Sequence, residues 1–230
     1  FRSVATCSYG QLTEIYSTPQ AAYDAALTLY EQGQYEASMR AFGEYGGRLN
    51  ADEADFFELA NSFELRQKNT LAAVKAYIKL HPYSCYMDEL HFMSGVLQVE
   101  KTRYKQALKE LDKVDQEQLF RPHQADYLFY KGYAYLQQKE LTKASQLFQK
   151  LRKLDSKYTL QARYYYAYCQ YSQEKYSKAL PEFLAIEHTA QFKRIVPYYI
   201  IQIYYQQGQY DEVYRSEEHT SELQSHLNLV

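Results

Sequence analysis

Large apolar residues and small residues recur along the chain at a fixed spacing. In the segment KYSKALPEF (175–183), an aromatic residue is followed by Ala three positions later and by a second aromatic residue four positions after that. With substitutions at single members, the spacing occurs five times, with first members Tyr35, Thr70, Tyr104, Leu141 and Tyr176, and Tyr210 with Val213 begins a sixth copy. The steps between first members are 35, 34, 37, 35 and 34 residues. Steps this even indicate an internal structural repeat.

Each of these segments follows a second stretch with helical character. Nine residues before the first member, three copies carry a small residue, which lets one helix approach its partner closely: Gly95, Gly132 and Ala167. The residues between the two stretches are turn-like, as in QGQ at 32–34 and again at 207–209. Gly33 and Gly208 suit the left-handed residue that ends a helix. Each unit is therefore predicted to be a helix A, a tight turn and a helix B.

Composition favours helices and excludes several kinds of site. Only 8 Gly and 5 Pro occur in 230 residues, whereas a β-rich fold needs many turns. The net charge of −2 gives no electrostatic reason to expect nucleic acid or an anionic membrane as partner. No apolar run approaches the ~20 residues that span a bilayer. The three Cys and six His are scattered without metal-ligand spacing, so we expect no metal, no cofactor and no disulfide framework.

The repeat resembles the tetratricopeptide repeat family, whose unit is a helix-turn-helix of about 34 residues. The resemblance covers residues 18–214, although the family's usual Trp is missing and two copies depart from the pattern, at Thr70 and Val213. It implies an all-α fold, an α-solenoid that forms a right-handed superhelix of about five and a half units. The units are expected near 18–51, 52–86, 87–123, 124–158, 159–192 and, truncated, 193–214.

The two ends fall outside the repeat. Residues 1–17 are expected to be a leader or the remnant of a signal peptide, with lipidation at Cys7 as the alternative. Residues 215–230 resemble a translated sequencing adapter and are expected to be a non-native tail. The alternative for this tail is a polar capping helix.

A narrower resemblance begins at Ala167. The text from there to Val213 is similar to the large, many-repeat tetratricopeptide proteins of the Bacteroidota cell envelope. The stretch AYIKLHPYSCYMDELHF (76–92) resembles the periplasmic cell-division coordinator and the outer-membrane assembly lipoprotein. These likenesses imply a location in the periplasm or at the outer membrane, with the cytoplasm as the alternative.

Tyrosine is the unusual feature of the composition, with 27 residues. Tyr164, Tyr168 and Tyr171 are spaced i, i+4, i+7, which puts them on one face of a helix. In the family that face lines a concave groove, and the resemblance implies a partner-binding set of Phe129, Tyr133, Tyr164, Tyr168, Tyr171, Tyr198, Gln202 and Tyr205. The alternative is that these rings only pack against one another. The Lys and Asn residues with which some relatives grip a peptide carboxylate are absent from the matching positions, so no such clamp is expected.

We therefore expect a non-catalytic scaffold that binds a segment of a partner protein or peptide in an aromatic groove. The alternative is a periplasmic assembly or adaptor factor of the outer-membrane biogenesis or cell-division coordinator type. An enzyme would need a further domain beyond residue 214, and no catalytic motif occurs before it. The partner's identity and the oligomeric state stay open.

Overall fold

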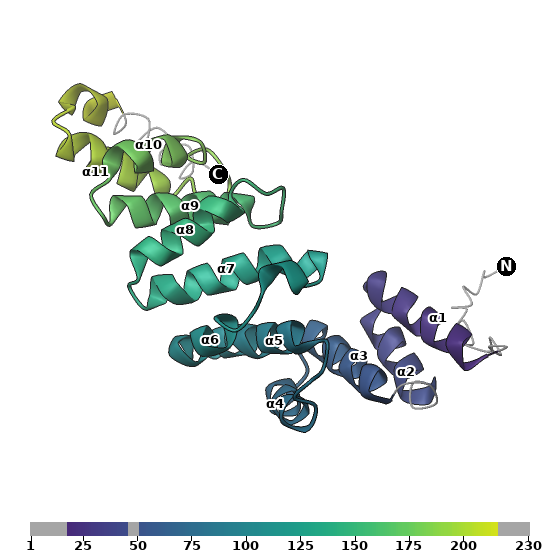
Figure 1. Cartoon of the computed structure of the whole chain (residues 1–230). Helices are drawn as coiled ribbons and strands as arrows, with labels where there is room; N and C mark the ends of the chain where they lie inside the picture. Colours follow the sequence, from purple (N-terminus) through teal and green to yellow (C-terminus); the bar gives the residue numbers. More distant parts are fainter. Residues whose placement is uncertain (1–17, 46–50, 216–230) are drawn as a thin grey trace, which may run out of the picture. The chain divides into compact units, whose positions relative to one another are not determined.

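The computed structural model describes residues 18–45 and 51–215, and within these ranges all regular structure is helical (Figure 1). The expected leader lies outside the described residues, and so does the expected tail apart from Arg215. By its internal contacts the chain divides into two compact units, residues 1–84 and 85–230. The prediction of an all-α fold is confirmed.

The first unit contains two helical hairpins. Its helices are α1 (Pro19–Glu31), α2 (Tyr35–Tyr45), α3 (Ala51–Glu64) and α4 (Thr70–Leu80). Within this unit α1 packs on α2, α2 on α3 and α3 on α4. Pro19 is tolerated in the first turn of α1, where a backbone N–H has no partner within the helix. The hydroxyl of Thr18 caps this end by accepting a hydrogen bond from the Ala21 N–H at 3.2 Å.

Stacked rings and a buried hydrogen-bond chain hold the first unit together. Phe42 of α2 stacks on Phe57 of α3 with centroids 5.0 Å apart. The Asn61 amide donates to the hydroxyl of Ser38, which in turn donates to the carbonyl of Ala26, at 3.0 and 2.9 Å. All three helices α1, α2 and α3 are thereby linked through buried polar groups, which are stable inside a protein only when they are paired.

The second unit continues the same arrangement. Its elements are α5 (Met87–Glu100), α6 (Tyr104–Leu111), the short 3-10 helix η2 (Gln116–Gln118), α7 (Arg121–Gln137), α8 (Leu141–Leu151), α9 (Thr159–Tyr171), α10 (Tyr176–Leu184) and α11 (Val196–Gln206). Residues 210–215 are also helical. Every helix from α5 to α11 packs on its successor, which is the neighbour-by-neighbour contact expected of stacked repeats.

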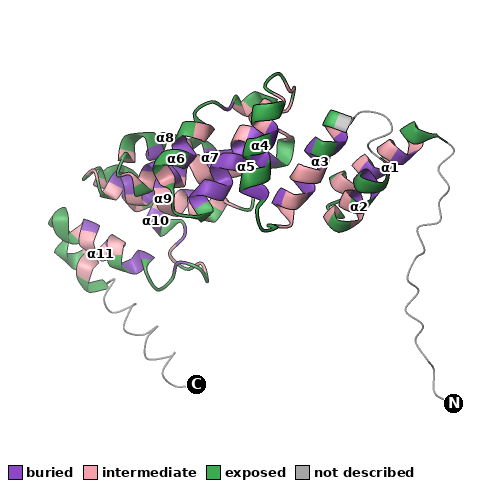
Figure 2. Ribbon diagram, turned by 90° about the horizontal axis from the view of Figure 1, so that it is seen from below, coloured by how far each residue is buried: buried purple, intermediate pink, exposed green. Residues whose placement is uncertain are grey.

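The helices begin where the repeated spacing begins. The second helix of each hairpin, α2, α4, α6, α8 and α10, starts at Tyr35, Thr70, Tyr104, Leu141 and Tyr176. In the second unit, the small and the large apolar members of the spacing are fully buried: Ala107, Leu111, Ala144, Phe148, Ala179 and Phe183. The spacing therefore marks the core-facing side of each second helix, and Figure 2 shows such buried positions on the paired helices. The repeat boundaries themselves stay a prediction.

The predicted close approach of paired helices occurs at two glycines. A Cβ atom on Gly95 would lie 2.5 Å from Cγ of Leu111, which is closer than real Cβ contacts allow. A Cβ atom on Gly132 would lie 3.1 Å from the ring of Phe148, a tighter contact than most but one that a small shift relieves. Helix α5 can therefore pack on α6 at this distance only without a side chain at position 95.

The turn inside each hairpin contains a residue in the left-handed conformation. Gly33 and Gly208 adopt it with φ of 74° and 70°, so the prediction for both is confirmed. In the other hairpins non-glycine residues take this role: Arg66, Thr102, Lys139 and Glu174 have φ between 51° and 61°. Since this conformation costs a residue with a side chain about 1 kcal/mol, the surrounding helices must stabilise these turns.

Candidate partner-binding groove

A hollow of about 620 Å³ lies over α7, the start of α8, and α9 in the second unit. Its main lining is aromatic: Tyr133 from α7 and Tyr164, Tyr165 and Tyr168 from α9. The remaining lining residues are Leu136, Gln137, Lys139, Leu141 and Ser172. We call this surface the tyrosine hollow. Its walls come from the first helices of two successive hairpins, as expected for a groove lined by A helices.

Three of the predicted groove residues line the tyrosine hollow: Tyr133, Tyr164 and Tyr168. Tyr164 and Tyr168 stand one helical turn apart on α9, with centroids 6.5 Å apart and nearly parallel rings. Phe129 lies beside the hollow, stacked on Tyr133 at 6.3 Å and on Tyr158 at 4.2 Å. These contacts give Phe129 a supporting position, because its ring faces are covered by other rings.

Tyr164 belongs partly to the core. Its ring stacks on Phe192 with centroids 4.8 Å apart and an interplanar angle of 9°. Its edge contacts Phe183 at 6.2 Å and Tyr199 at 6.3 Å. Burial, and after it the hydrogen bond with Tyr199, raise the pKa of the Tyr164 phenol above its ordinary value. One side of this ring therefore fixes α9 in place, while the rest of it lines the hollow.

Tyr171 packs between α9, α10 and α11 and does not line the hollow. Its ring lies 5.1 Å from Tyr199 and 5.8 Å from Tyr176. Tyr199 of α11 also contacts Tyr168 at 6.0 Å and stacks on Phe183 at 5.1 Å. It is thus the ring on which α9, α10 and α11 meet, and the aromatic-packing interpretation holds for Tyr171.

The other predicted groove residues lie on α11, away from the hollow. Tyr198 and Tyr205 are 62% and 57% exposed, and Gln202 between them is partly exposed. Tyr205 contacts Tyr210 edge-on at 6.0 Å. The spacing placed all three on one face of α11, but the structure does not bring that face to the tyrosine hollow. Their role in binding stays a prediction.

Sequence reasoning assigned Tyr165 to the packing between helices and did not single out Tyr199. Both directly follow a predicted groove residue, and both occupy the same register relative to the second helix of their hairpin. Tyr165 lines the hollow and also packs in the core, stacked on Phe148 at 5.2 Å and near Tyr133 at 5.8 Å. The repeated register was the signal that could have found them.

The hollow is suited to binding a segment of protein. Its lining includes one cation, Lys139, and no carboxylate. Phenol rings give large contact area with little loss of rotamer freedom, and each keeps a hydroxyl for hydrogen bonding. Nearby Cys169 is buried, and burial raises the pKa of its thiol to about 12, so it remains protonated at neutral pH.

Two further observations concern the described residues as a whole. Nowhere in 18–45 or 51–215 do three His, Cys, Asp or Glu side chains come together as a metal site would require. None of the helices in these ranges combines the length and the apolar character of a membrane span. That the chain is not an enzyme stays a prediction.

Comparison with known proteins bears on the fold. Residues 92–159 match the family model described as tetratricopeptide repeat, and no curated protein matches the chain. The structure is similar to that of PilF from Pseudomonas aeruginosa, with 16% identity and a TM-score of 0.60 over 89% of this chain and 91% of that one. It is also similar to the C-terminal part of a TPR repeat-containing protein from Cytophaga hutchinsonii, with 16% identity and a TM-score of 0.58 over 90% and 83% of the two chains.

A third similar structure is a tetratricopeptide repeat protein from Parabacteroides merdae, with 13% identity and a TM-score of 0.51 over 87% of this chain and 77% of that one. At such identities the likeness concerns the fold alone. The sequence match and the structural matches agree on the same architecture. The chain therefore has the all-helical fold of the tetratricopeptide repeat solenoids, and residues 92–159 are similar in sequence to that repeat.

Proposed function

We propose that this protein is a non-catalytic scaffold whose tyrosine hollow binds a segment of a partner protein. The observation that carries the proposal is the convergence of Tyr133, Tyr164, Tyr165 and Tyr168, from two helices, on one hollow of about 620 Å³. None of these four rings is fully buried. A repeat fold of this family also suggests protein partners more than small-molecule chemistry.

The size and lining of the hollow favour a short peptide segment as occupant. A volume of this order accommodates a few side chains. Gln137 and Ser172 at its edge can hydrogen-bond the backbone of an extended or helical segment. The four tyrosine rings that line the hollow offer apolar faces to the segment's side chains.

A peptide-display selection tests the proposal. Peptides selected on the wild-type protein should bind the Tyr168→Ala variant at least about tenfold more weakly, because aromatic residues dominate such contacts. Tyr205→Ala is the matched control, since it removes the same ring from an exposed site outside the hollow. Circular dichroism checks that both variants keep their helices. Equal peptide affinity for wild type and Tyr168→Ala would exclude the tyrosine hollow as the binding site. A loss of affinity only in Tyr205→Ala would instead assign the binding site to α11.

We further propose that the protein acts in the periplasm or at the outer membrane, as an assembly or adaptor factor, with a cytoplasmic scaffold as the alternative. The support is the likeness of residues 167–213 to envelope proteins with many such repeats. Fractionation of the source cells with an antibody against this chain tests the location. Recovery in the cytosolic fraction would rule out the assembly role and leave the peptide-binding proposal intact.

A further inference from the structure

A second hollow, of about 680 Å³, lies over α7, α8 and the residues after α8. Four lysines line it: Lys131, Lys143, Lys150 and Lys153. We call this surface the lysine hollow. Lys143 and Lys150 are spaced i, i+7 on α8, with Gln146 and Leu147 between them on the same face. The core-facing side of α8 consists of other residues, Ala144, Ser145, Phe148 and Leu151.

Two of the four lysines are already paired. Lys131 Nζ lies 3.0 Å from Oδ1 of Asp112 and donates to the Tyr127 hydroxyl at 2.8 Å. Lys143 Nζ lies 2.6 Å from Oε2 of Glu140, which stands at the edge of this surface.

The other two lysines are available. Lys150 and Lys153 are exposed, and neither has an ion-pair partner among the described residues. No carboxylate lines the lysine hollow, so two positive charges in it are unbalanced. A surface of this kind attracts an anionic group that can displace water from both ammonium groups.

We propose that the lysine hollow binds an acidic segment of a partner polypeptide, in which Asp or Glu residues alternate with apolar ones. Charge complementarity calls for carboxylates opposite Lys150 and Lys153. Leu147 in the lining is partly exposed and offers contact to an apolar side chain, and the exposed Gln146 and Gln149 can hydrogen-bond a peptide backbone.

A phosphate-bearing partner fits this surface less well. Phosphate sites usually have the planar fork of Arg or the backbone N–H groups of a helix N-terminus. The lining has no Arg, and Lys150 lies at the C-terminal end of α8. The site is on α7 and α8 and shares no lining residue with the tyrosine hollow, so it stands independently of the function proposed above.

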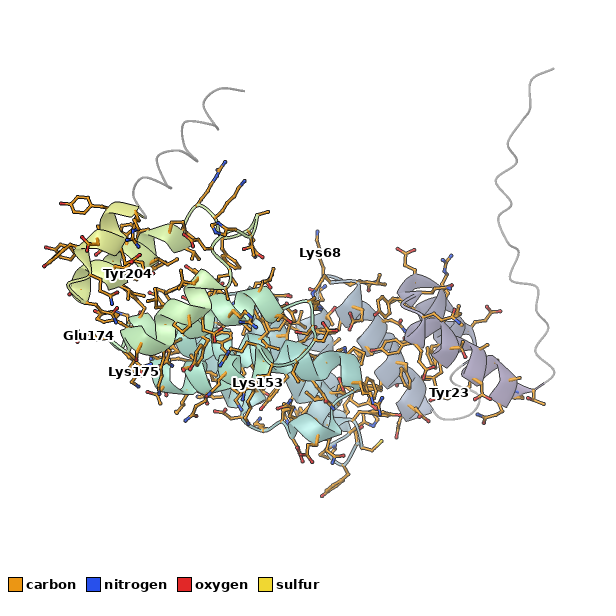
Figure 3. The ribbon with its side chains drawn as sticks, turned by 90° about the horizontal axis from the view of Figure 1, so that it is seen from above. Tyr23, Lys68, Lys153, Glu174, Lys175 and Tyr204 are labelled. Atoms are coloured by element: carbon orange, nitrogen blue, oxygen red, sulfur yellow. The ribbon has the colours of Figure 1, made fainter. Side chains whose placement is uncertain are left out.

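The test measures fluorescence anisotropy of a short labelled peptide that alternates Glu and Leu. The Lys150→Glu/Lys153→Glu variant should bind it at least about tenfold more weakly than wild type at low salt, and added salt should weaken wild-type binding. The control is Lys175→Glu/Lys178→Glu, which makes the same charge change at exposed positions outside both hollows. Lys153 and Lys175 are labelled in Figure 3 and lie apart in that view. The control should change the affinity less than about twofold.

Three results would overturn the proposal. Equal weakening in both double variants would mean that overall charge, and not this surface, attracts the peptide. Unchanged binding of a peptide with Gln in place of Glu would mean that apolar contact suffices. In the third result the Glu–Leu peptide fails to bind, whereas a single-stranded oligonucleotide or vesicles with anionic lipid bind wild type and not Lys150→Glu/Lys153→Glu. That result would assign the surface to nucleic acid or membrane. Circular dichroism on both variants confirms that they are folded.

Discussion

Helices α9 and α11 carry aromatic residues at the same register, yet their rings have different surroundings. Tyr164 on α9 is stacked on Phe192 at 4.8 Å and surrounded by other rings. Tyr198, at the matching position of α11, is 62% exposed. The spacing along a helix thus identifies which residues share a face. Whether that face is buried depends on which side chains of the following segment pack on it. This contrast can be tested on the rings themselves, and it extends to ion pairs of different exposure and to the buried phenols.

The largest difference is expected from removing one ring at each position. Tyr164→Ala should lower the free energy of unfolding by about 2–3 kcal/mol, since a large side chain packed against three rings leaves a cavity. Tyr198→Ala should cost less than about 0.5 kcal/mol, as is usual for surface substitutions. Urea unfolding followed by circular dichroism measures both. Similar losses in the two variants would contradict the contrast.

A smaller difference is expected from two glutamates that form ion pairs, one near each region. Glu182 of α10 is 12% exposed at its side chain and pairs with both Arg152 at 2.5 Å and Arg163 at 3.2 Å. Glu212 pairs with Arg215 at 3.0 Å, and their side chains are 42% and 71% exposed.

Glu182→Gln should therefore lower the free energy of unfolding by about 1–2 kcal/mol, because it leaves two partly buried guanidinium groups without their counterion. Glu212→Gln should change it by less than about 0.5 kcal/mol, because water screens an exposed pair. Thermal unfolding midpoints compare the two variants under the same buffer. A lower midpoint for Glu212→Gln than for Glu182→Gln would reverse the expected order.

The smallest effect is expected from alkaline pH. Burial raises the pKa of Tyr164 and of Tyr158 in the folded protein, so folding keeps these phenols neutral. The stabilisation is complete below the unfolded tyrosine pKa of ~10 and is lost as the pH rises above it, because the unfolded chain ionises first. The free energy of unfolding should fall above that pH, with a shallower slope in Tyr164→Phe. An identical slope in that variant would show that Tyr164 does not contribute.

Much of the fold could be predicted because the same helical spacing recurs along the chain. The first members of the spacing coincide with the starts of α2, α4, α6, α8 and α10. The glycine turns at Gly33 and Gly208 were predictable from residue type, since glycine reaches positive φ without strain. Arg66, Thr102, Lys139 and Glu174 were not, because only the packing of the flanking helices holds these residues in that conformation.

The irregular connections were harder to predict. The one long step of the repeat, 37 residues, contains η2 between α6 and α7. Phe192 lies in the connection between α10 and α11, outside any helix, yet it covers Tyr164. A pattern of helical spacing contains no information about such a residue, and this is why the sequence predicted the candidate site only in part. Tyr133, Tyr164 and Tyr168 line the hollow, while Tyr171 packs against Tyr199.

The absence of a side chain at Gly95 has an effect beyond its own hairpin. A methyl group there would act as a wedge between α5 and Leu111 of α6. Helix α7 packs on both α5 and α6, and it contributes Tyr133 to the tyrosine hollow and Lys131 to the lysine hollow. One carbon atom added at position 95 would therefore shift α7 and, with it, part of the lining of both hollows, although it touches neither of them.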